Sequence, residues 1–226
     1  MPEMPTLLVA AHGTVSSAGS ATTAALLNAI TAARPDVPAA LCFLDVARPR
    51  LIETLAAHPE PTVIVPLLLS AGFHVLEDIP AVVSGHPLVR VARHLGPDPL
   101  VIEVLVDRLA AVRRTGRVGT TVLVGAGSSH PAGAEDLAYA GQLLATRLGR
   151  PVPVLTLGQD VRAALVRAAA PVEVATYLLA PGHFLDNLRA AAVAAGSKVT
   201  VAEPIGVHPA LVTLVLARYD EVLAAV

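Results

Sequence analysis

The 226-residue sequence has few residues that form crosslinks or stack on nucleic-acid bases: one cysteine, three phenylalanines, three tyrosines and no tryptophan. A single cysteine, Cys42, excludes an internal disulfide and any metal site built from several cysteines. We expect Cys42 to be a small buried side chain within a strand. Scarce aromatic residues argue against a platform for stacked bases. The net charge of −2 gives no overall basic field, so nucleic acid is not an expected partner.

Long hydrophobic runs are also absent. The N-terminal apolar run is short and has no basic segment before it, which argues against a signal peptide. No stretch approaches the ~20 apolar residues that span a bilayer. The chain is nevertheless 54% hydrophobic and only 15% charged, which indicates a large packed core. We therefore expect a cytoplasmic protein with no membrane partner, folded as one domain or as two of about 100 residues.

Short apolar runs alternate with helical patterns along the chain, which is typical of a parallel sheet covered by helices. In the first half, strands are predicted over residues 6–11, 39–46, 62–69 and 88–94, and helices over residues 21–33, 50–58 and 99–114. Residues 16–20 read as a polar loop. Asp78 and Pro80 favour the start of a short helix after the third strand.

The second half of the chain repeats the first. TLLVAAHGT at 6–14 aligns with TVLVGAGSS at 121–129, and residues 68–72 align with 178–182. The repeat predicts an α/β fold of two duplicated Rossmann-like lobes, each a four-stranded parallel sheet flanked by helices, with a cleft between their strand ends. The predicted lobes are residues 1–115 and 120–226, and residues 116–119 read as a linker.

Three polar residues of the first half lack a polar counterpart: His12 aligns with Gly127, Asp45 with Gly158 or a neighbour, and His74 with Phe184. Residues needed only for folding should recur in both halves. The asymmetry therefore indicates that these three residues do chemistry, while the second half forms a wall. His183 lies one place from the position of His74, and it is either a substrate contact or a polar residue at a helix start.

The three residues follow neighbouring strands of a parallel sheet, where ligands of open α/β sheets bind. Two imidazoles and a carboxylate suit Fe²⁺, Co²⁺ or Ni²⁺, and histidine, with a reference pKa of about 6.5, also suits general-base chemistry. Structural roles are the alternative: Asp45 can cap the next helix, and Glu77 and Asp78 can be helix-start acids instead of ligands. No GxGxxG or Walker pattern follows Gly13, so a nucleotide site is not expected.

Three segments resemble class II chelatases of the sirohydrochlorin cobalto/ferrochelatase group: HGT at 12–14, FLD at 43–45 and GFHVLEDIP at 72–80. The resemblance implies a chelatase-like fold and insertion of Fe²⁺ or Co²⁺ into a sirohydrochlorin-type tetrapyrrole without ATP. It implies that His12 and His74 bind the metal and accept pyrrole protons. Asp45 falls where many members carry glutamate and is a third expected metal ligand. No cofactor beyond the substrate metal is implied.

Residues around the predicted rim are candidates for contacting a carboxylate-rich macrocycle: Thr14, Ser16, Arg48, Gly72, Phe73 and His183, with Arg50 as a second possible cation. One alternative function is a non-catalytic protein that binds and delivers a metal or tetrapyrrole. Another is an α/β hydrolase-type enzyme, which the lack of a G-x-S-x-G motif disfavours. The sequence leaves open the metal, the tetrapyrrole, and whether the chain is a monomer or a homodimer.

Overall fold

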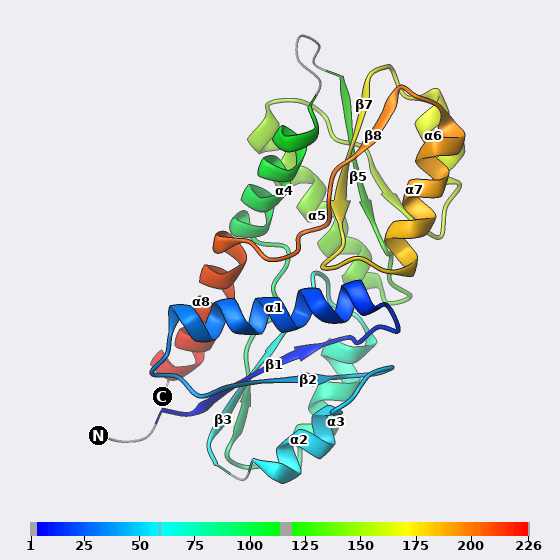
Figure 1. Cartoon of the computed structure of the whole chain (residues 1–226). Coiled ribbons are helices and arrows are strands. Elements are labelled where there is room, and N and C mark those ends of the chain that lie inside the picture. Colours follow the sequence, from blue (N-terminus) through cyan, green and yellow to red (C-terminus); the bar gives the residue numbers. More distant parts are fainter. Residues whose placement is uncertain (1–3, 59, 114–118, 226) are drawn as a thin grey trace.

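The computed structural model describes residues 4–58, 60–113 and 119–225. Strands and helices alternate through both halves (Figure 1). The first half contains β1 (Thr6–Ala11), α1 (Ser17–Ala33), β2 (Ala39–Phe43), α2 (Leu51–Ala57), β3 (Thr62–Pro66), η1 (His74–Asp78), α3 (Ile79–Val83), β4 (Val89–Val91) and α4 (Pro99–Val112). The second half contains β5 (Thr120–Gly125), α5 (Pro131–Leu148), β6 (Val154–Thr156), α6 (Val161–Arg167), β7 (Val172–Tyr177), α7 (His183–Ala195), β8 (Val199–Val201) and α8 (Pro209–Ala224). Within the described ranges, no helix combines the length and apolar character needed to cross a bilayer.

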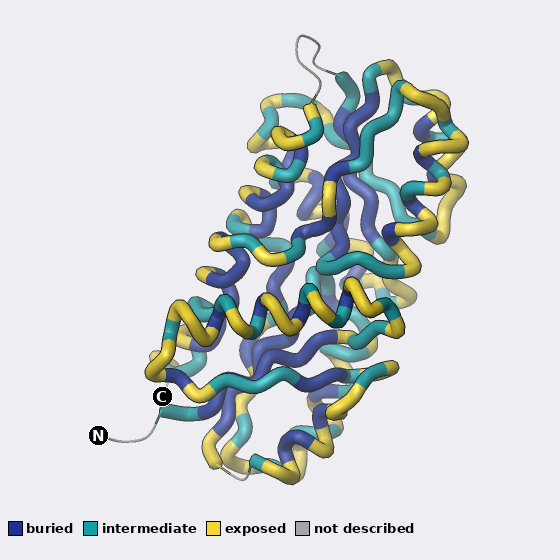
Figure 2. Tube along the Cα trace, in the orientation of Figure 1, coloured by how far each residue is buried: buried dark blue, intermediate teal, exposed yellow. Residues whose placement is uncertain are grey.

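Each half forms a four-stranded parallel sheet, which confirms the predicted fold class. The strand orders are β2-β1-β3-β4 and β6-β5-β7-β8. Every residue of the central strands β1 and β3 is buried, as expected for continuous apolar runs covered on both faces. The central strands appear as dark tubes inside partly exposed helices (Figure 2). Because β1 and β3 are neighbours, the loops that follow them lie at the same edge of the sheet.

The last helix of each half packs on the other half. Helix α4 contacts β7 and α5, whereas α8 contacts β3 and α1, as their places in Figure 1 also show. Both helices bury apolar residues in one hydrophobic core that draws on both sheets. The predicted ranges 1–115 and 120–226 therefore correspond to the two sequence repeats and not to the two lobes in space. In space, the last helix of each repeat packs on the sheet of the other repeat. Most of the predicted linker, residues 116–118, lies outside the described residues.

Several predicted boundaries were wrong. Helix α1 begins at Ser17 within the predicted polar loop, because the Ser16 hydroxyl accepts a hydrogen bond from Gly19 N at 3.3 Å and caps the helix. Strand β3 ends at Pro66, and residues 67–73 form a loop that we call the first rim loop. The helix predicted to open near Asp78 starts earlier, as the single π-helical turn η1 that continues into α3.

Hydrogen bonds define how the two repeats correspond. Thr6 and Thr120 each open a central strand, and each donates its N–H to a proline carbonyl that precedes the neighbouring strand, both at 2.9 Å. The predicted alignment of His12 with Gly127 was therefore wrong by one residue. His12 corresponds to Ala126, because the turn after the strand conserves its glycine, not the residue before it.

The glycines of this turn have the same unusual conformation in both lobes, with φ of 100° at Gly13 and 91° at Gly127. The hydrogen bonds that follow the second and third strands of each sheet confirm the remaining two pairs: Asp45 with Gly158, and His74 with Phe184. The loop that corresponds to the first rim loop spans residues 178–182, and we call it the second rim loop.

Candidate functional site

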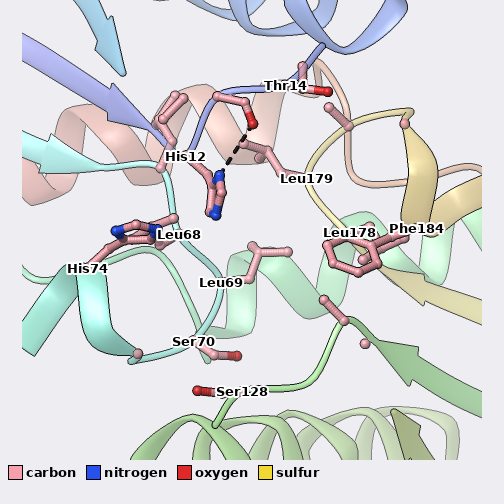
Figure 3. Close-up of a pocket in the computed structure, with 18 of the residues that line it drawn as sticks. His12, Thr14, Leu68, Leu69, Ser70, His74, Ser128, Leu178, Leu179 and Phe184 are labelled. Carbon is pink, nitrogen blue, oxygen red and sulfur yellow. Dashed lines mark hydrogen bonds between the residues drawn. The ribbon is translucent and has the colours of Figure 1, made fainter. Parts of the chain in front are cut away.

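A cavity of about 620 Å³ lies between the lobes, at the C-terminal ends of the central strands of both sheets. This volume is typical of small-molecule sites. Most of the lining is apolar and comes from the two rim loops and the turns after β1 and β5 (Figure 3). Among the described residues that line it there is no arginine, lysine, aspartate or glutamate. Histidines therefore provide the basic groups of its wall.

The structure brings His12 and His74 together at this cavity. His12 follows β1 and His74 opens η1 after the adjacent strand β3. Their ring centroids are 4.6 Å apart and their planes meet at 87°, so the rings stand edge to face (Figure 3). Two imidazoles from different loops thus meet because two neighbouring parallel strands end at the same edge.

Hydrogen bonds orient both rings through Nδ1. His74 Nδ1 lies 2.5 Å from Asp78 Oδ2, one turn along η1. His12 Nδ1 lies 3.3 Å from Gly13 O. A neutral imidazole that donates from Nδ1 has its lone pair on Nε2, the nitrogen that is then available to a metal ion or a proton. Asp78 accordingly contacts a histidine, in an arrangement that fixes ring orientation at many metal sites.

A close backbone contact holds the turn that carries His12. Asp45 N donates to His12 O at 2.9 Å. A Cβ atom on Gly13 would lie 2.3 Å from Asp45 O, a distance that leaves no room for a side chain. Glycine is therefore required here for space as well as for its positive φ.

The Asp45 carboxylate does not join the histidines in the cavity wall. The side chain is half exposed and lies 3.8 Å from Arg50. A hydrogen bond from Val46 N–H, together with the positive charges of Arg50 and the two histidines, holds the pKa of Asp45 below its usual value. In the part of the chain that the structure describes, no three His, Cys, Asp or Glu side chains are grouped to hold a metal ion. The predicted three-ligand set is thus not assembled here, because the backbone of Asp45 faces the His12 turn.

Of the predicted substrate contacts, Thr14, Gly72, Phe73 and His183 line the cavity. Ser16 and Arg48 do not. The Ser16 hydroxyl caps α1, and Arg48 is three-quarters exposed and pairs with Glu53. Arginines near the second strand are thus oriented toward surface carboxylates.

Sequence reasoning missed several lining residues of the second lobe: Ser128, Tyr177, Leu178 and Phe184. The repeat contained the signal, since Ser128 corresponds to Thr14 and Phe184 to His74. Residues at positions equivalent to a predicted site belong to the opposite wall of the same cavity when the lobes face one another.

Comparisons with known proteins agree with this architecture. The family model described as CbiX matches residues 6–112 and again residues 120–222, one match for each repeat. A sirohydrochlorin ferrochelatase of Priestia megaterium is 36% identical over 121 residues, which are 48% of this chain and 46% of that protein. The match thus spans about half of that relative.

Two solved structures share the fold. SirB from Bacillus subtilis with Fe³⁺ superposes with a TM-score of 0.80 at 23% identity, covering 96% of this chain and 95% of that one. CbiX, the terminal enzyme for siroheme biosynthesis in denitrifying bacteria, gives a TM-score of 0.71 at 19% identity, with 98% and 99% covered. Because the family model matches both repeats and nearly the whole described chain, this protein belongs to the CbiX family.

Proposed function

We propose that this chain inserts a divalent metal ion into a sirohydrochlorin-type tetrapyrrole without ATP, and that His12 and His74 bind the metal and accept the pyrrole protons. The observation that carries the proposal is the edge-to-face pair of imidazoles in the wall of an apolar cavity between the lobes. Membership of the CbiX family and the curated relative named a sirohydrochlorin ferrochelatase support the same reaction.

The metal is a substrate that must be bound and then released. Imidazole nitrogens suit Fe²⁺, Co²⁺ and Ni²⁺. Two protein ligands leave coordination positions open, whereas the four ligands of a structural site close the shell around the ion. Asp78 keeps Nε2 of His74 directed at the metal and makes it a stronger ligand. The negative charge of Asp45 is near enough to sense both histidines, so it attracts a cation without completing the shell.

The cavity suits a flat, largely apolar macrocycle. Leu69, Phe73 and Phe184 offer apolar surface from both lobes, and the hydroxyls of Thr14 and Ser128 offer hydrogen bonds at opposite sides. Because no described lining residue carries a full positive charge besides a protonated histidine, the peripheral carboxylates of the substrate face the open mouth and the solvent. The ring nitrogens then face the histidine pair.

The exchange of metal for protons balances across the histidine pair. Two metal–imidazole bonds break as metal–pyrrole bonds form, and two pyrrole N–H protons leave the ring. Each Nε2 lone pair that releases the metal is free to take one of these protons and pass it to solvent. A base placed in this way contributes ~10²–10⁴-fold to a rate. No phosphate is consumed in this scheme, so ATP has no part in it.

The test is anaerobic metal insertion. Purified protein is mixed with sirohydrochlorin and Fe²⁺, Co²⁺ or Ni²⁺, and the absorbance change of the macrocycle is followed for the wild type, His12→Ala and His74→Ala. We expect turnover that falls ~10²–10⁴-fold in each variant. A wild-type rate equal to the metal–tetrapyrrole background contradicts the proposal. Tight binding without turnover would instead identify a protein that delivers metal or tetrapyrrole.

A further inference from the structure

Two corresponding glycines lie where the lobes approach each other closely. A Cβ atom on Gly133 of α5 would lie 2.2 Å from Ala71 O in the first rim loop. A Cβ atom on Gly19 of α1 would lie 2.6 Å from Pro181 O in the second rim loop. Gly19 and Gly133 occupy equivalent places in the repeats, as do Ala71 and Pro181. The first helix of each lobe therefore packs directly on the backbone of the opposite rim loop.

The hydrogen bonds to the two rim loops do not follow this symmetry. Ala71 N–H donates to Asp136 Oδ2 of α5 at 2.6 Å. Hydrogen bonds to a carboxylate are shorter and stronger than neutral ones. In the second rim loop Pro181 has no N–H to donate. On α1 the residue that corresponds to Asp136 is Thr22, whose hydroxyl donates to Ala18 O within its own helix. Among the described residues, this contact between a helix carboxylate and a rim-loop amide therefore occurs at the loop that leads to the histidine pair and has no counterpart at Thr22 and Pro181.

Two more side chains help to hold the first rim loop. His94 Nε2 lies 3.0 Å from the same Asp136 Oδ2, and both side chains are largely buried. Tyr177 of β7 donates its hydroxyl to Leu69 O at 2.8 Å. Burial, together with nearby carboxylates, raises the pKa of Tyr177, so its hydroxyl keeps its proton and remains a donor. The second lobe therefore holds the first rim loop at two backbone positions.

We infer that Asp136, a residue of the second repeat, is a positioning residue that sets where His74 stands relative to His12. The inference deepens the proposed function and rests on it. His74 follows Ala71 by only three residues. Its contact with Asp78 fixes the orientation of the ring, whereas the location of its backbone depends on the first rim loop. The second lobe has no histidine at the positions that correspond to His12 and His74. Through Asp136 it nevertheless helps to determine the geometry of the metal site in the first lobe.

The test compares Asp136→Leu and Asp136→Asn with a matched control, Asp107→Asn, all in the full chain. Asp107 also pairs with a histidine, His208, at 3.2 Å, but neither lines the cavity. One readout is hydrogen exchange of the Ala71 amide by NMR, and the other is Co²⁺ affinity by spectroscopic titration without tetrapyrrole. We expect Asp136→Leu to speed exchange and weaken Co²⁺ binding about 10–100-fold. Asp136→Asn keeps an acceptor oxygen, so it should retain part of the protection of the Ala71 amide and part of the Co²⁺ affinity. Asp107→Asn should change neither the exchange rate nor the Co²⁺ affinity.

A double-mutant cycle separates positioning from general weakening. In a His74→Ala background, Asp136→Leu should add little to the loss of Co²⁺ affinity, because the residue it positions is gone. Additive losses would overturn the inference. Unchanged Ala71 exchange would overturn it as well, and so would faster exchange at unchanged Co²⁺ affinity.

Thermal unfolding checks that each variant folds. If Asp136→Leu does not fold, Asp136→Asn carries the same comparison, since it weakens the same contact to the first rim loop. A wild type that binds no Co²⁺ contradicts the proposed function, and the inference then fails with it. A wild type that binds Co²⁺ and turns over, beside an unaltered Asp136→Leu variant, contradicts the inference alone.

Discussion

The two walls of the cavity have the same backbone arrangement but different side chains. His12 and His74 meet at the rim of the first lobe, whereas Ala126 and Phe184 occupy the corresponding positions of the second. Both walls keep a glycine turn with positive φ after the first strand. Folding therefore accounts for the turn, and it does not account for the histidines. The residues that differ between the walls are the ones to connect with function.

The second lobe nevertheless shapes the first wall. Its helix α5 and strand β7 supply Asp136 and Tyr177 to the first rim loop, and α8 covers the sheet of the first lobe. In return, α4 packs on β7. Each lobe thus depends on the other for its core, and the histidine pair depends on both. A wall without the histidine pair thus still contacts the loop that leads to it.

The largest difference between the walls should appear when each loses one ring at the same position. His74→Leu should lower the turnover of sirohydrochlorin metallation by ~10²–10⁴-fold, because it removes a proposed metal ligand and proton acceptor. Phe184→Leu removes only apolar contact and should raise KM by a few-fold. Steady-state kinetics of both variants test this. Equal losses would mean that the rings serve alike as packing surface.

The glycine turns offer the next comparison. Gly13→Ala should lower the free energy of unfolding by about 2–4 kcal/mol for two reasons. The new Cβ would lie 2.3 Å from Asp45 O, and the alanine would have to adopt a positive φ. For Gly127→Ala the nearest atom is Thr156 Cβ at 3.2 Å, so the strain of about 1–2 kcal/mol should dominate. Urea unfolding at equilibrium measures both values. A larger loss at Gly127 would refute the steric argument.

The carboxylates of the first lobe should differ from one another as well. Asp78→Asn should weaken Co²⁺ binding about 10–100-fold, because Asp78 orients His74 through a contact of 2.5 Å. Leu188 occupies the corresponding position of α7, so the second lobe has no such contact to lose. Asp45→Asn should cost less than about tenfold, since its carboxylate faces Arg50. Spectroscopic titration decides the order, and a greater loss for Asp45→Asn would make Asp45 a direct ligand.

The smallest effect concerns Cys42, whose counterpart in β6 is Leu155. Burial raises the pKa of Cys42 to about 12, so the native thiol should react with a disulfide reagent at pH 8 only after unfolding. The folded state holds the proton more tightly than the unfolded chain. The contribution of the buried Cys42 thiol to stability is therefore complete below about pH 8.5, and it declines as the pH rises toward 12.

Denaturant midpoints at rising pH, compared between the wild type and Cys42→Val, isolate this contribution. Between pH 8 and pH 10.5 the wild type should lose more stability than Cys42→Val does. Rapid labelling of the native thiol would show that β2 opens readily and would contradict its burial.

Several features were predictable from local sequence patterns. Continuous apolar runs predicted β1 and β3, and the repeat predicted two parallel sheets with corresponding elements. The positions of Gly13, His12 and His74 after the predicted strands followed from the point where each apolar run gives way to small and polar residues. Prediction failed at Ser16, where a side-chain cap extends α1 into a segment with loop-like composition. It also failed in the one-residue misalignment of His12, because apolar residues in a strand are interchangeable in a sequence comparison.

By itself the sequence determined the strands, the repeat and the presence of reactive groups in one repeat, because these depend on residue type and on spacing along the chain. Only the tertiary structure decided that His12 and His74 meet, that the Asp45 carboxylate stays outside the cavity, and that Asp136 and Tyr177 reach across to the first rim loop. The reason is physical. Contacts between residues distant in the chain depend on helix packing and loop paths, which small differences in side-chain volume set and which no local pattern records.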